Sequence, residues 1–102
     1  MNKPSLDVRW HLGPLRALIL ENRRLRAVVL PEYGGRIWSI RYKPLDRELL
    51  WKSPRIPAHR PAFGAVYDDV WSGGWDEVFP NDAPGVIHGE RYPDHGEVWA
   101  SG

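Results

Sequence analysis

The chain has 102 residues, enough for one small domain or part of a larger one. It contains no Cys, which excludes a disulfide framework and thiolate chemistry. No apolar run approaches the roughly 18–20 residues needed to span a bilayer. We therefore expect a cytoplasmic protein with no membrane partner.

The net charge of +1 hides a strong asymmetry along the chain. Residues 1–60 carry 13 basic and 5 acidic side chains, a balance of +8, whereas residues 61–102 carry 1 and 8, a balance of −7. A nucleic-acid surface is one interpretation of the basic part. The Arg side chains, however, are spread singly among apolar residues, so we favour solvated strand faces that partly complement the acidic segment. We expect no nucleic-acid partner.

The first half of the chain alternates apolar and polar side chains at period two, with turn signals about every ten residues, which predicts an all-β fold of short strands. The predicted strands cover residues 6–12, 15–20, 25–30, 36–42 and 48–51. Strand 6–12 should be half-buried, with Leu6, Val8, Trp10 and Leu12 on one face. Strand 36–42 should place Ile37, Ser39 and Arg41 on one face and Trp38, Ile40 and Tyr42 on the other.

The second half of the chain has a different character. Residues 53–62 hold three Pro and predict an extended loop, 64–70 a short strand or turn, and 96–100 a further strand. Residues 71–99 hold three of the six Trp, two of the four His and many carboxylates on a path broken by Gly and Pro. Flat aromatic faces beside polar groups are typical of a pocket wall for a neutral, hydroxyl-rich ligand.

Two segments, 73–80 (G-G-W-D-E-V-F-P) and 93–99 (P-D-H-G-E-V-W), carry a family resemblance. Together they resemble the galactose mutarotase-like superfamily, which includes the aldose 1-epimerases, and residues 25–37 are similar to the opening hairpin of that family. The resemblance implies a β-supersandwich that binds an aldose and interconverts its α and β anomers by acid/base catalysis, without a cofactor. It also implies that His95 holds and polarises the sugar near its ring oxygen.

Family members carry a second His and a Glu general base in later strands. We therefore expect residues 1–102 to be the N-terminal part of a single mutarotase-like β-sandwich domain, inactive by itself. A non-catalytic carbohydrate-binding or structural β module is the alternative. Since an incomplete sandwich leaves strand edges unpaired, we also expect marginal stability or self-association.

The candidate catalytic residue is His95. The neighbouring carboxylates of Asp94 and Glu97 should favour the charged form of its imidazole. The alternative is that His95 is a loop residue bonded to the backbone. Substrate-binding candidates are Arg36, Trp75, Asp76, Glu77, Asn81 and Glu97.

These candidates also have structural interpretations. One of Asp76 and Glu77 should be exposed, because neighbours on a strand point to opposite faces. Asn81 fits turn chemistry as well as hydroxyl binding. Trp75 is expected first as a core residue and second as a sugar platform. We expect Arg36 to form an ion pair with the acidic segment, either at the surface or behind the ligand, and not to take part in catalysis.

His88, His95 and the nearby carboxylates are of the residue types that bind metal ions. The spacing of the two His lacks the His-x-His and His-Glu-x-x-His patterns of common metal sites, so we expect no metal.

Overall fold

The computed structural model describes residues 3–62, 65, 67–76, 85–92 and 95. Its strands are β1 (Ser5–Leu12), β2 (Leu15–Glu21), β3 (Leu25–Leu30), β4 (Arg36–Tyr42), β5 (Arg47–Glu48), β6 (Gly85–Ile87) and β7 (Glu90–Tyr92). A 3-10 turn, η1 (Lys43–Leu45), joins β4 to β5, and α1 (Tyr67–Val70) is a single helical turn. The predicted all-β class is confirmed.

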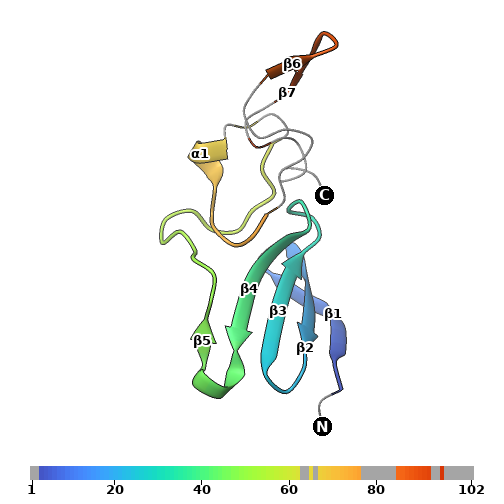
Figure 1. The fold of residues 1–102 in the computed structure, drawn as a ribbon, viewed down its shortest axis with the longest axis vertical. Coiled ribbons are helices and arrows are strands. Elements are labelled where there is room, and N and C mark those ends of the chain that lie inside the picture. Colours follow the sequence, from blue (N-terminus) through green and yellow to red (C-terminus); the bar gives the residue numbers. More distant parts are fainter. Residues whose placement is uncertain (1–2, 63–64, 66, 77–84, 93–94, 96–102) are drawn as a thin grey trace.

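The first five strands form one antiparallel sheet in the order β1-β2-β3-β4-β5, and β6 and β7 form a separate hairpin (Figure 1). Short turns connect neighbouring strands. At the β2–β3 turn the amide oxygen of Asn22 accepts hydrogen bonds from the backbone N–H groups of Arg24 and Leu25, both at 2.8 Å. Such local side-chain bonds explain why Asn favours turns. No helix among the described residues is long and apolar enough to cross a membrane.

Strand β1 carries a bulge that the period-two pattern did not reveal. Its pairing with β2 shifts by one residue between Asp7 and Trp10, so Leu6 lies opposite Leu20 whereas Trp10 lies opposite Ala17. Leu6 and Trp10 are therefore on opposite faces of the sheet. The expectation that they share one half-buried face is wrong. Leu6, Val8 and Trp10 are more than half exposed, at 57%, 60% and 54%.

A second bulge changes the faces of β4. Its pairing with β3 shifts where Val28 lies opposite Ser39 and Val29 lies opposite Ile37, which leaves Trp38 as the additional residue. Ile37 therefore shares a face with Ile40. The alternation predicts instead that Ile37 shares a face with Ser39 and Arg41, and this prediction is wrong. One additional residue on a strand reverses the face of every side chain beyond it.

The core lies on the face of the sheet to which Leu15, Ala17 and Ile19 contribute. Its buried hydrophobic residues are Leu15, Ala17, Ile19, Leu30 and Tyr33. All but Ile19 form one cluster, and Ala58 from the Pro-rich segment 53–62 packs against it. The segment is the loop that its three Pro predict, and it covers one end of the sheet.

The remaining predicted elements differ from the structure in their extent or type. Strand β5 spans two residues, fewer than the predicted 48–51. Residues 67–70 form a helical turn, so the strand interpretation of 64–70 is wrong. The β6–β7 hairpin was not predicted. Its turn residues His88 and Gly89 both have positive φ, 52° and 80°, as a tight type I′ turn requires. The predicted strand 96–100 lies outside the described residues.

Candidate functional site

The Gly73–Gly74 segment enters the sheet beside the start of β4. The N–H and C=O groups of Ile37 both bond to Trp75, at 2.9 and 2.8 Å. On the other side, the N–H of Gly74 donates to the carbonyl of Trp51 at 2.9 Å. The segment therefore lies as a short added strand between β4 and residues 51–53, which fixes the position of the residues that follow it.

Only glycine fits at this position of closest approach. Gly73 has φ +113°, and a Cβ there would lie 2.4 Å from the carbonyl oxygen of Trp51. Gly74 has φ +83°, and its Cβ would lie 2.8 Å from the carbonyl oxygen of Ile37. The Gly-Gly pair thus serves two purposes, because it permits a left-handed backbone and removes side chains where three chain segments meet.

Arg36, the first residue of β4, is completely buried. Its Nη1 donates to the carbonyl of Gly73 at 2.5 Å, and its Nη2 pairs with Oδ2 of Asp76 at 3.2 Å. The guanidinium also lies over the ring of Tyr33, 4.1 Å from its centroid. The expected ion pair with the acidic segment is present, and it is a buried pair. Arg36 is thereby a structural anchor for residues 73–76.

Asp76 links Arg36 to an aromatic group. Its side chain is 10% exposed, and its second oxygen, Oδ1, accepts a hydrogen bond from the hydroxyl of Tyr67 at 3.3 Å. Burial, together with the neighbouring Asp76 carboxylate, raises the pKa of Tyr67 well above its usual value. Tyr67 is therefore a hydroxyl donor throughout the neutral range.

His95 lies flat against Tyr67, with ring centroids 3.7 Å apart and planes 11° from parallel. The same Tyr67 ring stacks on Trp71 on α1's C-terminal side, at 6.2 Å, and Trp71 stacks on Trp51 at 5.2 Å. Four rings, from His95 through Tyr67 and Trp71 to Trp51, form a continuous row that we call the aromatic row. We call the aromatic row, with Arg36 and Asp76, the Tyr67 cluster.

Trp75 is 52% exposed, although its backbone is paired with Ile37. The expectation that it is first of all a core residue is wrong. The added strand that contains Trp75 has one side facing solvent, and period-two pleating turns Trp75 to that side while Asp76 turns inward. Three further candidates, Glu77, Asn81 and Glu97, lie outside the described residues.

The sequence interpretation missed the residues that join the candidates to one another. Tyr67 was read as part of a strand or turn, yet it contacts both Asp76 and His95. Ser72 was not singled out, although it is fully buried and shares a 2.8 Å hydrogen bond with the hydroxyl of Tyr33. The local signal for Tyr67 is an aromatic residue between the Pro-rich segment 53–62 and the Trp-containing segment 71–75, which is too common a pattern to identify a site.

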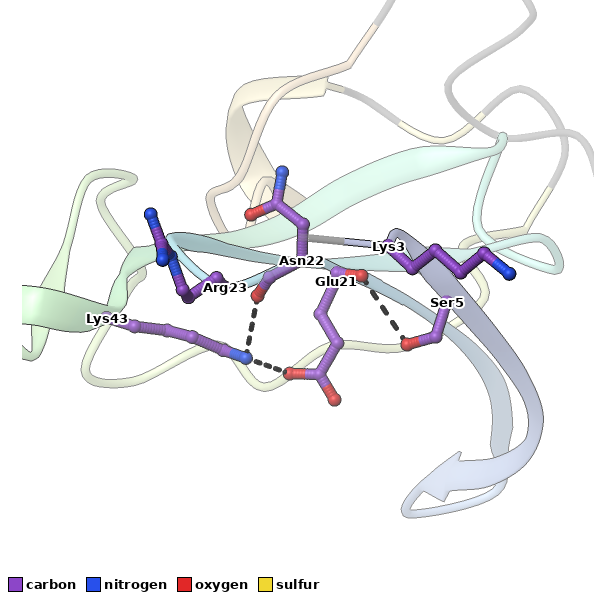
Figure 2. A pocket seen from close by; sticks show the side chains of 6 residues that line it. All are labelled: Lys3, Ser5, Glu21, Asn22, Arg23 and Lys43. Carbon is purple, nitrogen blue, oxygen red and sulfur yellow. Dashed lines mark hydrogen bonds and ion pairs between the residues drawn. The ribbon is translucent and has the colours of Figure 1, made fainter. Parts of the chain in front are cut away.

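The pocket beside the β2–β3 turn differs from the Tyr67 cluster in the residues that line it. A pocket of about 270 Å³ beside the β2–β3 turn is lined by Lys3, Ser5, Glu21, Asn22, Arg23 and Lys43 (Figure 2). It has no aromatic wall, and Lys43 reaches across it to Glu21 at 2.7 Å. Among the described residues, no three His, Cys, Asp or Glu side chains gather into a group that could hold a metal ion.

The chain matches no protein-family model, and no curated protein or solved structure is significantly similar to it.

Proposed function

We propose that the Tyr67 cluster binds an aldose, as part of an aldose 1-epimerase-like protein that interconverts sugar anomers. The observation that carries this proposal is the stacking of His95 on Tyr67 at 3.7 Å, with the Tyr67 hydroxyl in turn bonded to Asp76. It joins the imidazole expected to act on the sugar, an aromatic wall and a buried carboxylate in one group.

The cluster has both kinds of surface that sugar binding needs. Aromatic faces cover the C–H surface of a pyranose, and polar groups bond its hydroxyls. The aromatic row supplies an aromatic surface that includes His95 itself. Arg36 holds Asp76 from beneath and stays out of solvent.

The proposed chemistry assigns the acid role to His95. The imidazolium donates a proton to the ring oxygen while a base removes the proton of the anomeric hydroxyl, and the bond between C1 and the ring oxygen breaks. The open aldehyde rotates and closes on its other face, which returns both protons. The resemblance assigns the base to a Glu of later strands in the family. Asp76 is a poor substitute, because both its oxygens are already engaged.

That engagement of Asp76 favours a second candidate function, a carbohydrate-binding module without catalysis. In this case the same cluster would bind sugar and leave the rate of anomer exchange unchanged. The two candidates share a binding site and differ only in turnover.

The β-sandwich implied by the resemblance belongs to the same proposal. The register places Leu20, Ala27 and Ile40 side by side on the face of the sheet opposite the core. None of the three is buried, and Leu20 is 44% exposed. A sheet face of this composition is normally covered by a second layer, as in sandwiches.

Sugar binding can be measured on this chain by ¹⁵N–¹H NMR with glucose and galactose. Anomer exchange would be followed by polarimetry from the pure α anomer, in a protein that also supplies the Glu base of the later strands. There, exchange faster than the spontaneous rate supports the epimerase, and binding without faster exchange supports the module. In the catalytic case His95→Ala in that protein should lower kcat/KM by about 10²–10⁴-fold, the usual range for a lost acid/base partner.

The matched control is His11→Ala, on the exposed strand β1. His59 is less suitable, because its ring lies against Tyr33 at 5.7 Å. We expect His11→Ala to leave binding and exchange unchanged. Absence of saturable sugar binding, or equal losses in the two variants, would rule out the proposed site.

A further inference from the structure

A row of four charged residues crosses the sheet at the end opposite the Tyr67 cluster. The register places Glu21 opposite Arg26, Arg26 opposite Arg41, and Arg41 opposite Glu48, on four successive strands. Side chains of directly opposed residues lie on the same face. This charge row therefore reads acidic, basic, basic, acidic across β2 to β5.

Both outer carboxylates are already paired with lysines from outside the row. Lys43 lies 2.7 Å from Glu21 (Figure 2), and Lys52 lies 2.8 Å from Glu48. The Glu48 carboxylate also accepts hydrogen bonds from Ser39 and from three backbone N–H groups. Both carboxylates are thus already engaged by lysines, and Glu21 acts on Arg26 only through its charge, without a hydrogen bond or ion pair between them.

The two arginines differ in what they contact. Arg41 donates to the carboxylate of Asp46 at 2.9 Å. Arg26 makes no hydrogen bond or ion pair with any described residue, and its Nε is buried without a partner. Two like charges directly opposite each other on a sheet repel. An unpaired Arg26 beside Arg41 is therefore a place where an anion would be stabilised.

These arginines line a groove of about 420 Å³ on the core face of the sheet, together with Val28, Trp38 and the Glu48–Lys52 ion pair. A second hollow, of about 400 Å³, is lined by Pro14, Pro57 and Ala58. The two hollows share Leu12 and Trp38, so a cationic end continues into an apolar one.

The net charge of the row and its ion-pair partners indicates the charge of the anion. The row and its partners contain four basic groups, Arg26, Arg41, Lys43 and Lys52, and three acidic ones, Glu21, Asp46 and Glu48. A surplus of one positive charge matches a monoanion, whereas a phosphate dianion would overcompensate it. The planar guanidinium forks of two arginines also match the geometry of a carboxylate.

We infer that this groove binds a small carboxylate with an apolar body. The carboxylate lies between Arg26 and Arg41, and the apolar body extends past Trp38 toward Pro57 and Ala58. Arg41 follows Arg36 by five residues on β4, so at about 3.3 Å per residue the groove lies roughly 17 Å from the ion pair of the Tyr67 cluster. The inference is independent of sugar binding.

Benzoate is the probe, because it combines a carboxylate with a flat apolar ring. In a ¹⁵N–¹H NMR titration at low salt, we expect saturable shifts of the Arg26 Nε–H, the Arg41 amide and the Trp38 indole N–H. Acetate should bind the same groups more weakly, and inorganic phosphate more weakly than benzoate. Benzyl alcohol, which has the ring without the charge, should cause no such shifts. Shifts by benzyl alcohol as large as those by benzoate, or tighter binding of phosphate, would overturn the assignment.

Three variants test the role of Arg26. Arg26→Gln should weaken benzoate binding by at least about 10-fold, the loss expected for a charge-assisted hydrogen bond. Arg26→Lys keeps the charge without the planar fork and should bind with intermediate affinity. The control Arg55→Gln, in the exposed part of the Pro-rich loop, should bind as the unmodified chain does. Equal benzoate affinity in Arg26→Gln and Arg55→Gln would show that Arg26 holds no anion.

Discussion

Arg36 and Asp76, 40 residues apart in the chain, form an ion pair of 3.2 Å with side chains that are 0% and 10% exposed. One partner comes from the basic first part of the chain and the other from the acidic second part. This ion pair therefore joins the oppositely charged parts of the chain, because a buried cation of the sheet binds a carboxylate of the added strand. Because the pair is desolvated, neither partner can be removed without leaving the other unpaired.

The first prediction is that Asp76→Asn strongly destabilises the chain. It leaves the buried Arg36 guanidinium without a counter-charge, which costs about 3–5 kcal/mol in comparable cases. Denaturant unfolding followed by tryptophan fluorescence would measure the loss. The control is Asp46→Asn, whose pair with Arg41 has side chains 86% and 40% exposed. Exposed pairs contribute about 0–1 kcal/mol. Equal losses would show that the Arg36 pair is solvated.

A second prediction concerns Gly73. Gly73→Ala adds a Cβ that would lie 2.4 Å from the carbonyl oxygen of Trp51, in a backbone conformation with φ +113°. We expect the added strand to separate from residues 51–53, which the loss of the Gly74 N–H to Trp51 bond would report in hydrogen exchange. Gly13→Ala is the control for backbone strain alone, since Gly13 has φ +56° and open space around it. That variant should lose only about 1–2 kcal/mol.

Stability should depend on Glu48 at acid pH. Burial alone would raise the pKa of Glu48, but hydrogen bonds from Lys52, Ser39 and backbone N–H groups outweigh it and lower the pKa from 4.5 to about 2. The stabilisation is fully present above pH 4.5 and is lost as the pH falls toward 2. Because Glu48 and Lys52 are partly exposed, solvent screening reduces this contribution to about 1–2 kcal/mol.

Glu48→Gln should remove this pH dependence, so that the variant and the unmodified chain approach equal stability near pH 2 and differ most at neutral pH. Urea unfolding between pH 2 and 7 would measure both. Glu90→Gln, in the exposed β6–β7 hairpin, is the matched control and should leave the profile unchanged. A constant offset between Glu48→Gln and the unmodified chain at every pH would contradict the role of the Glu48 charge.

The sequence predicted the strands well and their faces poorly. The first four strands lie within one residue of their predicted bounds, because turn residues and alternating apolar side chains are local signals. The bulge between Asp7 and Trp10 and the bulge at Trp38 leave no such local signal in the sequence. Asp7 stabilises its bulge by accepting hydrogen bonds from Arg9 and Trp10, and these depend on side-chain geometry. A single bulge then reverses every later face.

The candidate site was predictable in its members and not in its connections. Arg36, Asp76 and His95 were all named from the sequence, and the structure joins them through Tyr67. The connection depends on where α1 places Tyr67, which is a tertiary property. The exposure of Trp75 has the same origin, because the added strand has a solvent-facing side that composition does not reveal. Tertiary context overrides local preference at such positions.

The edge of the sheet should promote self-association. Strand β1 has β2 as its single strand neighbour in the described sheet, and it exposes Val8 and Trp10. Unpaired edges with exposed apolar side chains recruit further strands. Val8→Lys should therefore shift the chain toward monomer in sedimentation velocity experiments, since a charge at an edge opposes pairing. Arg23→Lys, at the exposed β2–β3 turn, should leave the distribution unchanged. A monomeric unmodified chain at high concentration would contradict the prediction.

The last prediction separates the ring of Tyr67 from its hydroxyl. Tyr67→Leu removes the surface on which His95 lies, and an aromatic pair contributes about 0.5–1.5 kcal/mol beyond its buried area. We expect sugar affinity to fall by up to about 10-fold, since 1.4 kcal/mol corresponds to a factor of ten. Tyr67→Phe keeps the stack and loses the 3.3 Å bond to Asp76, so its affinity should stay close to that of the unmodified chain. NMR titration with the better-bound sugar would measure both variants, and the His95 imidazole resonances would report whether the ring stays in place. If Tyr67→Phe loses as much affinity as Tyr67→Leu, the hydroxyl bond to Asp76, and not the stacked ring, positions the site.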